Sequence, residues 1–380
     1  MKVVIAPDSF KGSLSAREAA QAMAAGVRRA WPQAQIVLLP LADGGEGTAE
    51  ALTAATGGRL VEHAVTGPLG ETVQAIYGLL GTDGGRAVVE MAQAAGLTLV
   101  PEGSRDPRLT TTFGVGELIQ AALDTGVREI VVGLGGSATN DGGAGAMQAL
   151  GVRFLDRLGK PLPWGGAALS RLARIDLDNF IFPSNQVRVI AASDVRNPLI
   201  GPDGASAVYG PQKGANAEMV AQLDAALTQY AEILKRDLGC DVAGLPGAGA
   251  GGGLGAAMSA FLHAEFRPGI DVVLDAAGFE ATARGADWIL TGEGRIDRQT
   301  LSGKTISGLL SRSRTLGVPV LAFGGSVDQD ALEDLSAQGL IGAIPLVARE
   351  VTLTQAMQEP ARVLEDAVAN ALVRLPTSSS

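Results

Sequence analysis

Acidic residues and glycines gather in five short loops, each of which follows an apolar run of the sequence. The loops are Pro7–Ser13, Ala42–Thr48, Gly135–Gly143, Ser193–Pro198 and Thr291–Asp297. Each loop holds a carboxylate, which Mg²⁺ accepts as a ligand, and most hold glycine, which lets backbone amides approach a ligand closely. One such loop is ordinary turn chemistry, but five predict a single polar cleft rich in acids.

Four of the six lysines in the sequence stand beside a glycine, and Lys160 does so in a weaker context than the others. The other three are Lys11, Lys213 and Lys304. The remaining positive charge is supplied mainly by arginine, so each of these lysines is a candidate phosphate contact as a compact point charge. The plain alternative for each one is a solvated turn lysine. Acids and lysines in one cleft are what magnesium-dependent phosphoryl transfer requires.

Other chemistries have weaker signals. The segment at 303–305 has the ending of a Walker A motif, but Arg298 stands where that motif needs glycine. Only His63 and His263 are present for a catalytic triad or a histidine zinc site. The stronger alternative is a dinucleotide site. The segment from Gly133 to Ala138 fits G-x-G-x-x-A, and Asp156 follows at about the spacing of a ribose-binding acid.

The elements that must position these loops alternate between apolar strands and alanine-rich helices, which predicts an α/β protein with a mainly parallel sheet. The first strand is expected at 3–6, and the helix at 15–30 begins with a capping box of Ser15 and Glu18. Further strands are expected at 36–40, 86–90, 129–132, 187–191, 288–290, 318–322 and 343–345, and helices at 47–56, 114–125, 143–150, 217–237, 303–316, 329–338 and 360–373. Ligands bind at the carboxyl ends of strands in such sheets, where the five loops lie.

Composition narrows the class of protein. Of 380 residues, 46% are hydrophobic and 18% are charged, which excludes a mainly disordered chain. The net charge of −10 predicts no binding to nucleic acid or to an anionic membrane surface. A single cysteine, Cys240, suits a reducing compartment. No apolar run reads as a signal peptide or a membrane span, so we expect a cytoplasmic protein.

Taken together and in order, the loops resemble the bacterial glycerate kinases of the first type. The matching strings are Ala6–Ala16, Pro40–Thr48, Gly133–Gly143, Ser193-Asp194 with Asn197–Leu199, Gly210–Gly214, Pro246–Gly255, and Thr291–Asp297 with Gln299-Thr300 and Gly303-Lys304. Small departures include Tyr209, where the family usually has phenylalanine, and Ile306, where it usually has proline. None of them removes a charged group, so the resemblance stands for most of the chain.

This resemblance implies ATP-dependent phosphorylation of D-glycerate with Mg²⁺, giving 2-phosphoglycerate in preference to 3-phosphoglycerate. It also implies two α/β domains with the active site in the cleft between them. A Rossmann-like or flavodoxin-like parallel-sheet domain is expected from residues 1–65 and 290–380, and an inserted mixed-sheet domain from 66–289. The run of short strands predicted at 60–82 agrees with a boundary near residue 66. A homodimer is compatible with the sequence.

We expect the following roles from the needs of phosphoryl transfer to an alcohol. The catalytic residues are Lys11, Asp43 and Asp194, with Asp194 as the base. Substrate binds to Ser9, Ser13, Ser137, Asn140, Asn197 and Lys213. The nucleotide binds to Gly44, Gly45, Gly292, Glu293, Gly294 and Lys304. Metal binds to Glu46, Asp141 and Asp297, although the division of the carboxylates between base and metal stays open.

Two rival functions stay open as well. One is a dinucleotide-dependent oxidoreductase of a small hydroxy acid, and the other is a non-catalytic sugar-acid sensor. A sensor normally carries a DNA-binding or partner module, and the sequence shows no basic helix-turn-helix pattern.

Overall fold

The computed structural model describes residues 1–42, 44–45, 47–81, 84–183, 185–301, 305–348 and 351–375. Contacts divide the chain into two compact units. The first contains Met1–Asp43, Ala54–Thr56 and Pro268–Ser380, and the second contains Gly44–Thr53 and Gly57–Arg267. Both chain ends therefore belong to one unit, and the middle of the chain forms the other.

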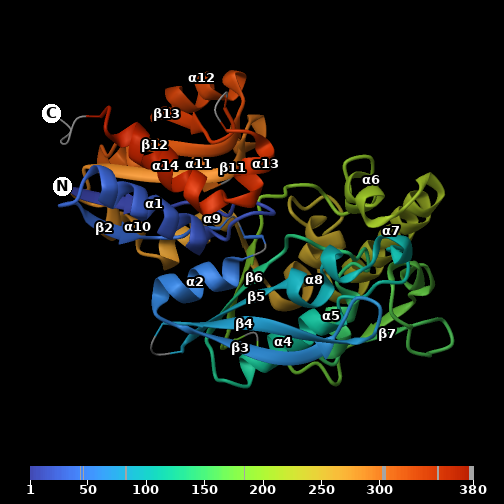
Figure 1. Cartoon of the computed structure of the whole chain (residues 1–380). Coiled ribbons are helices and arrows are strands. Elements are labelled where there is room, and N and C mark those ends of the chain that lie inside the picture. The colour runs from blue at the N-terminus through green and yellow to red at the C-terminus, as the bar shows by residue number, and fades with distance from the viewer. Residues whose placement is uncertain are drawn as a thin grey trace. The chain divides into compact units, whose positions relative to one another are not determined.

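The first unit is built on a five-stranded, all-parallel sheet in the order β13-β12-β11-β1-β2 (Figure 1). Its strands are β1 (Lys2–Ile5), β2 (Gln35–Leu38), β11 (Trp288–Ile296), β12 (Val320–Val327) and β13 (Leu340–Pro345). Its helices are α1 (Ala16–Ala30), α9 (Gly269–Ala276), α10 (Phe279–Ala283), α11 (Thr305–Leu316), α12 (Gln329–Ala337), α13 (Leu353–Gln358) and α14 (Pro360–Leu372), with a 3₁₀ turn η6 (Arg298–Leu301).

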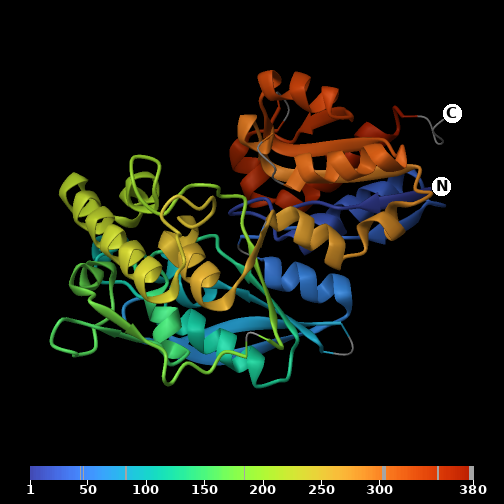
Figure 2. The same cartoon turned by 180° about the vertical axis from the view of Figure 1, so that it is seen from behind.

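The strand order reverses at β1 and β11. The chain steps from β1 to β2 in one direction and from β11 to β12 to β13 in the other. Right-handed crossovers then place α1 on one face of the sheet and α11 and α12 on the opposite face. Helices α1 and α14 lie side by side (Figures 1 and 2). Their apolar faces join one core cluster with side chains of β1, β11 and β12.

The helix α1 follows from its sequence as predicted. The Ser15 hydroxyl accepts a hydrogen bond from the Glu18 N–H, and the Glu18 carboxylate accepts one from the Ser15 N–H. This capping box satisfies backbone groups that the first turn cannot pair internally. The prediction of the capped helix is confirmed.

The second unit is built on a six-stranded mixed sheet in the order β10-β9-β6-β5-β4-β3. Four neighbours, β10, β9, β6 and β5, are parallel, and β4 and β3 continue the sheet antiparallel. The strands are β3 (Arg59–Thr66), β4 (Thr72–Leu80), β5 (Arg86–Glu90), β6 (Glu129–Gly133), β9 (Arg188–Ala192) and β10 (Glu265–Arg267), and a separate hairpin holds β7 (Arg153–Leu155) and β8 (Arg174–Asp176).

Seven helices of the described chain accompany this sheet. They are α2 (Thr48–Thr56), α3 (Met91–Ala95), α4 (Phe113–Leu123), α5 (Ala144–Ala149), α6 (Ala205–Tyr209), α7 (Ala217–Leu238) and α8 (Leu254–Leu262). The 3₁₀ turns are η1 (Leu97–Leu99), η2 (Glu102–Ser104), η3 (Gly166–Arg171), η4 (Pro211–Lys213) and η5 (Ala250–Gly253). A large apolar core lies between these elements and the sheet. None of the helices in the described part of the chain is long and apolar enough to cross a membrane.

The fold class is confirmed as α/β, with one parallel sheet and one mixed sheet. The boundaries between the two units, however, do not fall at 65/66 and 289/290, where the sequence analysis expects the domain boundaries. Strand β3 pairs along its length with β4, which places residues 59–66 in the second unit. Helices α9 and α10 pack on α11, which places residues from 268 onward in the first. The division into two domains stays a prediction.

One local expectation is wrong. Gly292, Glu293 and Gly294 were expected in a loop after a strand ending at residue 290. They lie inside β11, which pairs with β12 as far as Ile296. The glycines serve close packing there, because a Cβ on Gly292 would lie 2.5 Å from the carbonyl oxygen of Phe323.

Candidate functional site

In the first unit, Asp8 after β1 and Glu293 within β11 lie at one edge of the sheet. The Asp8 N–H donates to the carbonyl oxygen of Gly292 over 2.8 Å, so Asp8 lies level with the residue before Glu293. The Asp8 carboxylate accepts hydrogen bonds from the Ser9 N–H (2.6 Å) and from the Thr305 hydroxyl (2.5 Å). The Glu293 carboxylate accepts one from the Thr300 hydroxyl (2.5 Å).

The loop that follows β1 turns tightly beside β11. The Ser13 hydroxyl donates to the carbonyl oxygen of Phe10 over 2.9 Å. Gly294 packs against this loop, since a Cβ there would lie 3.2 Å from the backbone nitrogen of Lys11. The Lys11 side chain is exposed and Ser9 and Ser13 are half-buried. The structure thus places Ser9, Lys11, Ser13 and the glycines of β11 at the same edge of the sheet, and their roles in binding stay predictions.

Asp297 is less well suited to the metal role that the sequence predicts. Its carboxylate forms an ion pair with Arg295 over 3.0 Å and accepts a hydrogen bond from the Gln299 N–H over 2.8 Å. A metal ion there would have to compete with the guanidinium group. The sequence analysis predicts that the Asp297 carboxylate binds metal, whereas in the structure this carboxylate is paired with Arg295.

In the second unit, the carboxyl ends of three parallel strands meet in register. Glu90 of β5 pairs with Gly133 of β6, and Gly133 pairs with Ala192 of β9. Gly44 and Gly45 lie against the loop after β6. A Cβ on Gly133 would lie 2.6 Å from the carbonyl oxygen of Gly44, so only glycine fits this approach. This edge gathers the predicted loops at Gly44, Gly135–Gly143 and Ser193–Pro198.

Asp141 is buried in this edge and anchors the loop. Its carboxylate accepts hydrogen bonds from the Thr112 N–H and hydroxyl (both 2.8 Å), the Gly143 N–H (3.1 Å) and the Gly145 N–H (3.3 Å). Burial raises the pKa of Asp141, and the hydrogen bonds from these donors oppose the shift. With four donors on two oxygens, the carboxylate is better suited to a structural role than to the predicted metal role.

Lys213 is also buried, with 1% of its surface exposed. Its ammonium group donates to the carbonyl oxygen of Thr139 over 2.6 Å. Burial lowers the pKa of Lys213 to about 7, and the nearby Asp141 carboxylate opposes this shift. Asn140 is fully buried and donates to the Ser206 hydroxyl over 2.9 Å. Lys213 and Asn140, predicted to touch substrate, therefore lie behind the loop surface and support it.

Asp194 and Asn197 follow β9, and both are half-buried. The Asn197 amide is held at both ends, because its nitrogen donates to the carbonyl oxygen of Asp203 (2.8 Å) and its oxygen accepts from the Tyr209 hydroxyl (2.8 Å). Tyr209 is the position that departs from the resembled family, and burial raises the pKa of its phenol. Ser137, in the loop after β6, is half-buried and bridges to Gly96.

Three predicted residues, Asp43, Glu46 and Lys304, lie outside the described residues. Three residues outside the predicted set also lie at these sheet edges. Asp8 and Thr305 meet in the first unit, and Glu90 closes β5 in the second. An acidic residue directly after or at the end of an apolar strand is the signal that could have found Asp8 and Glu90. Within the described part of the chain, no three acidic, histidine or cysteine side chains come together as a preformed metal cluster.

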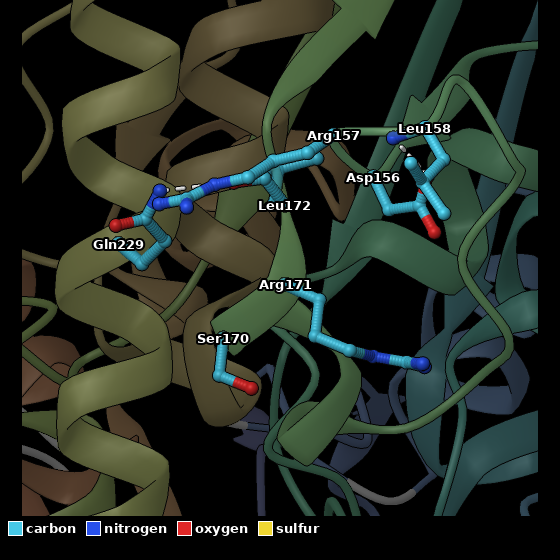
Figure 3. Close-up of a pocket in the computed structure, with 7 residues that line it drawn as sticks. All are labelled: Asp156, Arg157, Leu158, Ser170, Arg171, Leu172 and Gln229. Carbon is cyan, nitrogen blue, oxygen red and sulfur yellow. Dashed lines mark hydrogen bonds between the residues drawn. The ribbon is translucent and has the colours of Figure 1, made fainter.

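A surface pocket of about 320 Å³ lies away from these strand ends, beside the β7–β8 hairpin (Figure 3). It is lined by Asp156, Arg157, Leu158, Ser170, Arg171, Leu172 and Gln229. Asp156 closes a turn there, since its carboxylate accepts from the N–H groups of Leu158 (2.8 Å) and Lys160 (2.9 Å). A ribose-binding acid would follow a neighbouring strand of the main sheet, so the dinucleotide interpretation loses its acidic residue.

The glycerate kinase family matches residues 3–375, which is nearly the whole chain. The chain belongs to the glycerate kinase family. It is 49% identical over 371 residues to a glycerate kinase of Halalkalibacterium halodurans, covering 98% of this chain and 97% of the relative. It is 49% identical over 330 residues to a glycerate 2-kinase of Escherichia coli K12, covering 87% and 86%. The family members named in this way are phosphotransferases.

A crystal structure also supports the assignment of the chain to this family. A protein of Salmonella typhimurium LT2, described as a candidate glycerate kinase 2, superposes on this chain with a TM-score of 0.88 at 48% sequence identity. The match covers 98% of this chain and 97% of the other. The fold of nearly the whole chain therefore agrees with its membership in the glycerate kinase family.

Proposed function

We propose that this protein is an ATP-dependent glycerate kinase that transfers the γ-phosphoryl group to D-glycerate and forms 2-phosphoglycerate. The observation that carries the proposal is the match to the glycerate kinase family over residues 3–375. The relative named as a glycerate 2-kinase favours the 2-position of the acceptor.

The proposed chemistry is in-line transfer. The hydroxyl oxygen of glycerate attacks the γ-phosphorus, the bond from that phosphorus to the β–γ bridging oxygen breaks, and ADP leaves with the electron pair. Asp194 takes the hydroxyl proton in this proposal, with Asp43 assisting catalysis. Lys11 and Lys304 offset charge on the phosphates, and the serines at positions 9, 13 and 137 position the acceptor.

The described residues offer a suitable part of a magnesium site. Mg²⁺ is usually held by one or two carboxylates together with substrate phosphates and water. Asp8 and Glu293 supply two carboxylates at one edge of the sheet, where the Thr305 and Thr300 hydroxyl groups donate to them. We assign Asp8 and Glu293 to the metal, in preference to Asp141 and Asp297. The ion would neutralise charge that develops on the transferred group.

A coupled assay of ADP release over a panel of small hydroxy acids tests the proposal. We expect turnover with D-glycerate that requires both ATP and Mg²⁺, and a phosphorus NMR spectrum of the product that shows the 2-phosphate. Absence of ADP release with every acid would refute the proposed function. NADH quenching on titration would then point to the oxidoreductase, and glycerate binding without turnover to the sensor.

Location and assembly belong to the same proposal. The lone cysteine favours a reducing compartment, which supports a cytoplasmic enzyme. Light scattering on the purified protein distinguishes a monomer from the homodimer that the sequence allows.

A further inference from the structure

Glu90 is a buried acid for which neither the sequence nor the proposed reaction gives a role. It is the last residue of β5, and 2% of its surface is exposed. Burial of a carboxylate is costly unless hydrogen bonds compensate for the lost water. Among the described residues only Asp141 is an equally buried acid, and its donors are accounted for above. The partners of Glu90 therefore indicate what it does.

The carboxylate of Glu90 binds the start of helix α2. It accepts hydrogen bonds from the Gly47 N–H over 3.2 Å and from the Ala49 N–H over 2.5 Å. The first N–H groups of a helix have no partner within the helix, and a negative charge near them is favourable. Glu90 therefore satisfies two of these groups from a neighbouring strand.

The segment that Glu90 holds is the second acidic loop, which runs into α2. Its other side rests on the loop after β6, because Gly44 and Gly45 approach Gly133 and Gly135 too closely for any side chain between them. Within the segment, the Thr48 hydroxyl donates to the carbonyl oxygen of Gly45 over 2.7 Å. The described backbone of the loop is thus fixed at both ends.

We propose that Glu90 is a positioning residue for the kinase reaction, which holds the start of α2, and with it Gly44 and Gly45, at the edge of the sheet. The inference rests on the proposed function. Gly44 and Gly45 are among the predicted nucleotide-binding residues, so a change in the position of their backbone is expected to alter the transfer step.

The variant Glu90→Gln tests the anchor. Glutamine keeps one acceptor oxygen but places an NH₂ group against a backbone N–H, so one of the two hydrogen bonds is lost. Glu117 offers a matched control, since its half-buried carboxylate accepts a hydrogen bond from the Thr66 N–H over 2.6 Å in the same unit. Glu117→Gln removes a similar interaction away from the acidic loop.

Two measurements on the full-length protein are compared. Hydrogen exchange of peptides that cover residues 44–52 is expected to speed up by about tenfold in Glu90→Gln and to stay unchanged in Glu117→Gln. The kcat is expected to fall by about tenfold or more, while KM for glycerate stays within about twofold, because the loop acts on the transferred group. A purely structural Glu90 would lower Tm but leave kcat near the wild-type value.

The outcomes separate the two ideas. If the wild type shows no turnover with any acid, the proposed function fails, and the exchange measurement still reports on the anchor. If the wild type is active but Glu90→Gln retains its kcat, or leaves exchange at 44–52 unchanged, the positioning role of Glu90 is overturned.

Discussion

The ammonium group of Lys213 donates a hydrogen bond to the carbonyl oxygen of Thr139 over 2.6 Å, and both residues are buried. Lys213 comes from the turn η4, whereas Thr139 lies in the loop after β6. A lysine in this position links a distant turn to the loop that the proposed reaction uses. Because its charge is buried, it also affects how the stability of the protein depends on pH.

The first prediction concerns that pH dependence. Burial lowers the pKa of Lys213 to about 7 from 10.5, so between these values the unfolded chain binds a proton that the folded chain lacks. Stability should therefore rise with pH across this window, by at most about 1.4 kcal/mol per pH unit from this group. Lys213→Met should remove that contribution to the slope, as measured by urea unfolding at several pH values.

A control lysine shows whether the slope belongs to Lys213. Lys235 is exposed and pairs with Asp241 over 2.7 Å, so Lys235→Met should leave the slope between pH 7 and 10.5 unchanged. Equal slopes for the wild type and Lys213→Met would mean that Lys213 is not buried as a partly neutral amine.

The second prediction tests the structural role of Asp141. Asp141→Asn leaves one acceptor oxygen for four donors and strands buried N–H groups, so we expect a loss of about 2–4 kcal/mol in the free energy of unfolding. Asp156 is the control, because it accepts only two backbone hydrogen bonds, both on one oxygen at an exposed turn, and Asp156→Asn should cost about 1 kcal/mol or less. Denaturant unfolding of both variants makes the comparison. Wild-type stability for Asp141→Asn would return support to its predicted metal role.

Much of the fold was predictable, because local signals and tertiary packing agree. The helix expected at 217–237 is α7, Ala217–Leu238, which Asn216 caps at its start. Strands β7, β8 and β10 were missed, since each has three residues and too little periodicity to detect. In β11, the glycines at 292 and 294 resemble a turn signal, but pairing with β12 outweighs it.

The candidate site was predicted in outline only. The rule that ligands bind at strand ends pointed to these edges, and the loops expected after β1, β6 and β9 lie there, whereas residues 291–296 lie inside β11. It could not show which polar residues are buried. Asp141 and Lys213 are buried by Thr112 and by segments far along the chain, and no local pattern in the sequence reports such contacts. Lys11, by contrast, is exposed, as a phosphate contact requires.

The third prediction addresses catalysis directly. Asp194→Ala should lower kcat by about 10²–10⁴, the usual contribution of a general base. Lys11→Ala should lower kcat by a factor on the order of 10², because a cation that stabilises the transferred group is lost. Lys160→Ala is the control, since Lys160 also follows a glycine but lies exposed in a turn between β7 and β8. The kcat of this variant should stay within about twofold of the wild-type value. Coupled ADP release measures all three, and near-normal kcat for both site variants would reject the assignment.

The last prediction concerns Gly252, which presses the glycine-rich segment against the loop after β6. Its φ is +67°, and a Cβ there would lie 1.9 Å from the carbonyl oxygen of Thr139, the same oxygen that Lys213 binds. Gly278 has a similar φ of +60° with open space around it. Gly278→Ala should therefore cost about 1–2 kcal/mol from backbone strain alone. Gly252→Ala adds a steric conflict with backbone atoms and should cost roughly 3 kcal/mol or more. Thermal unfolding of the two variants separates strain from crowding, and equal losses would show that the loop moves aside to admit a methyl group.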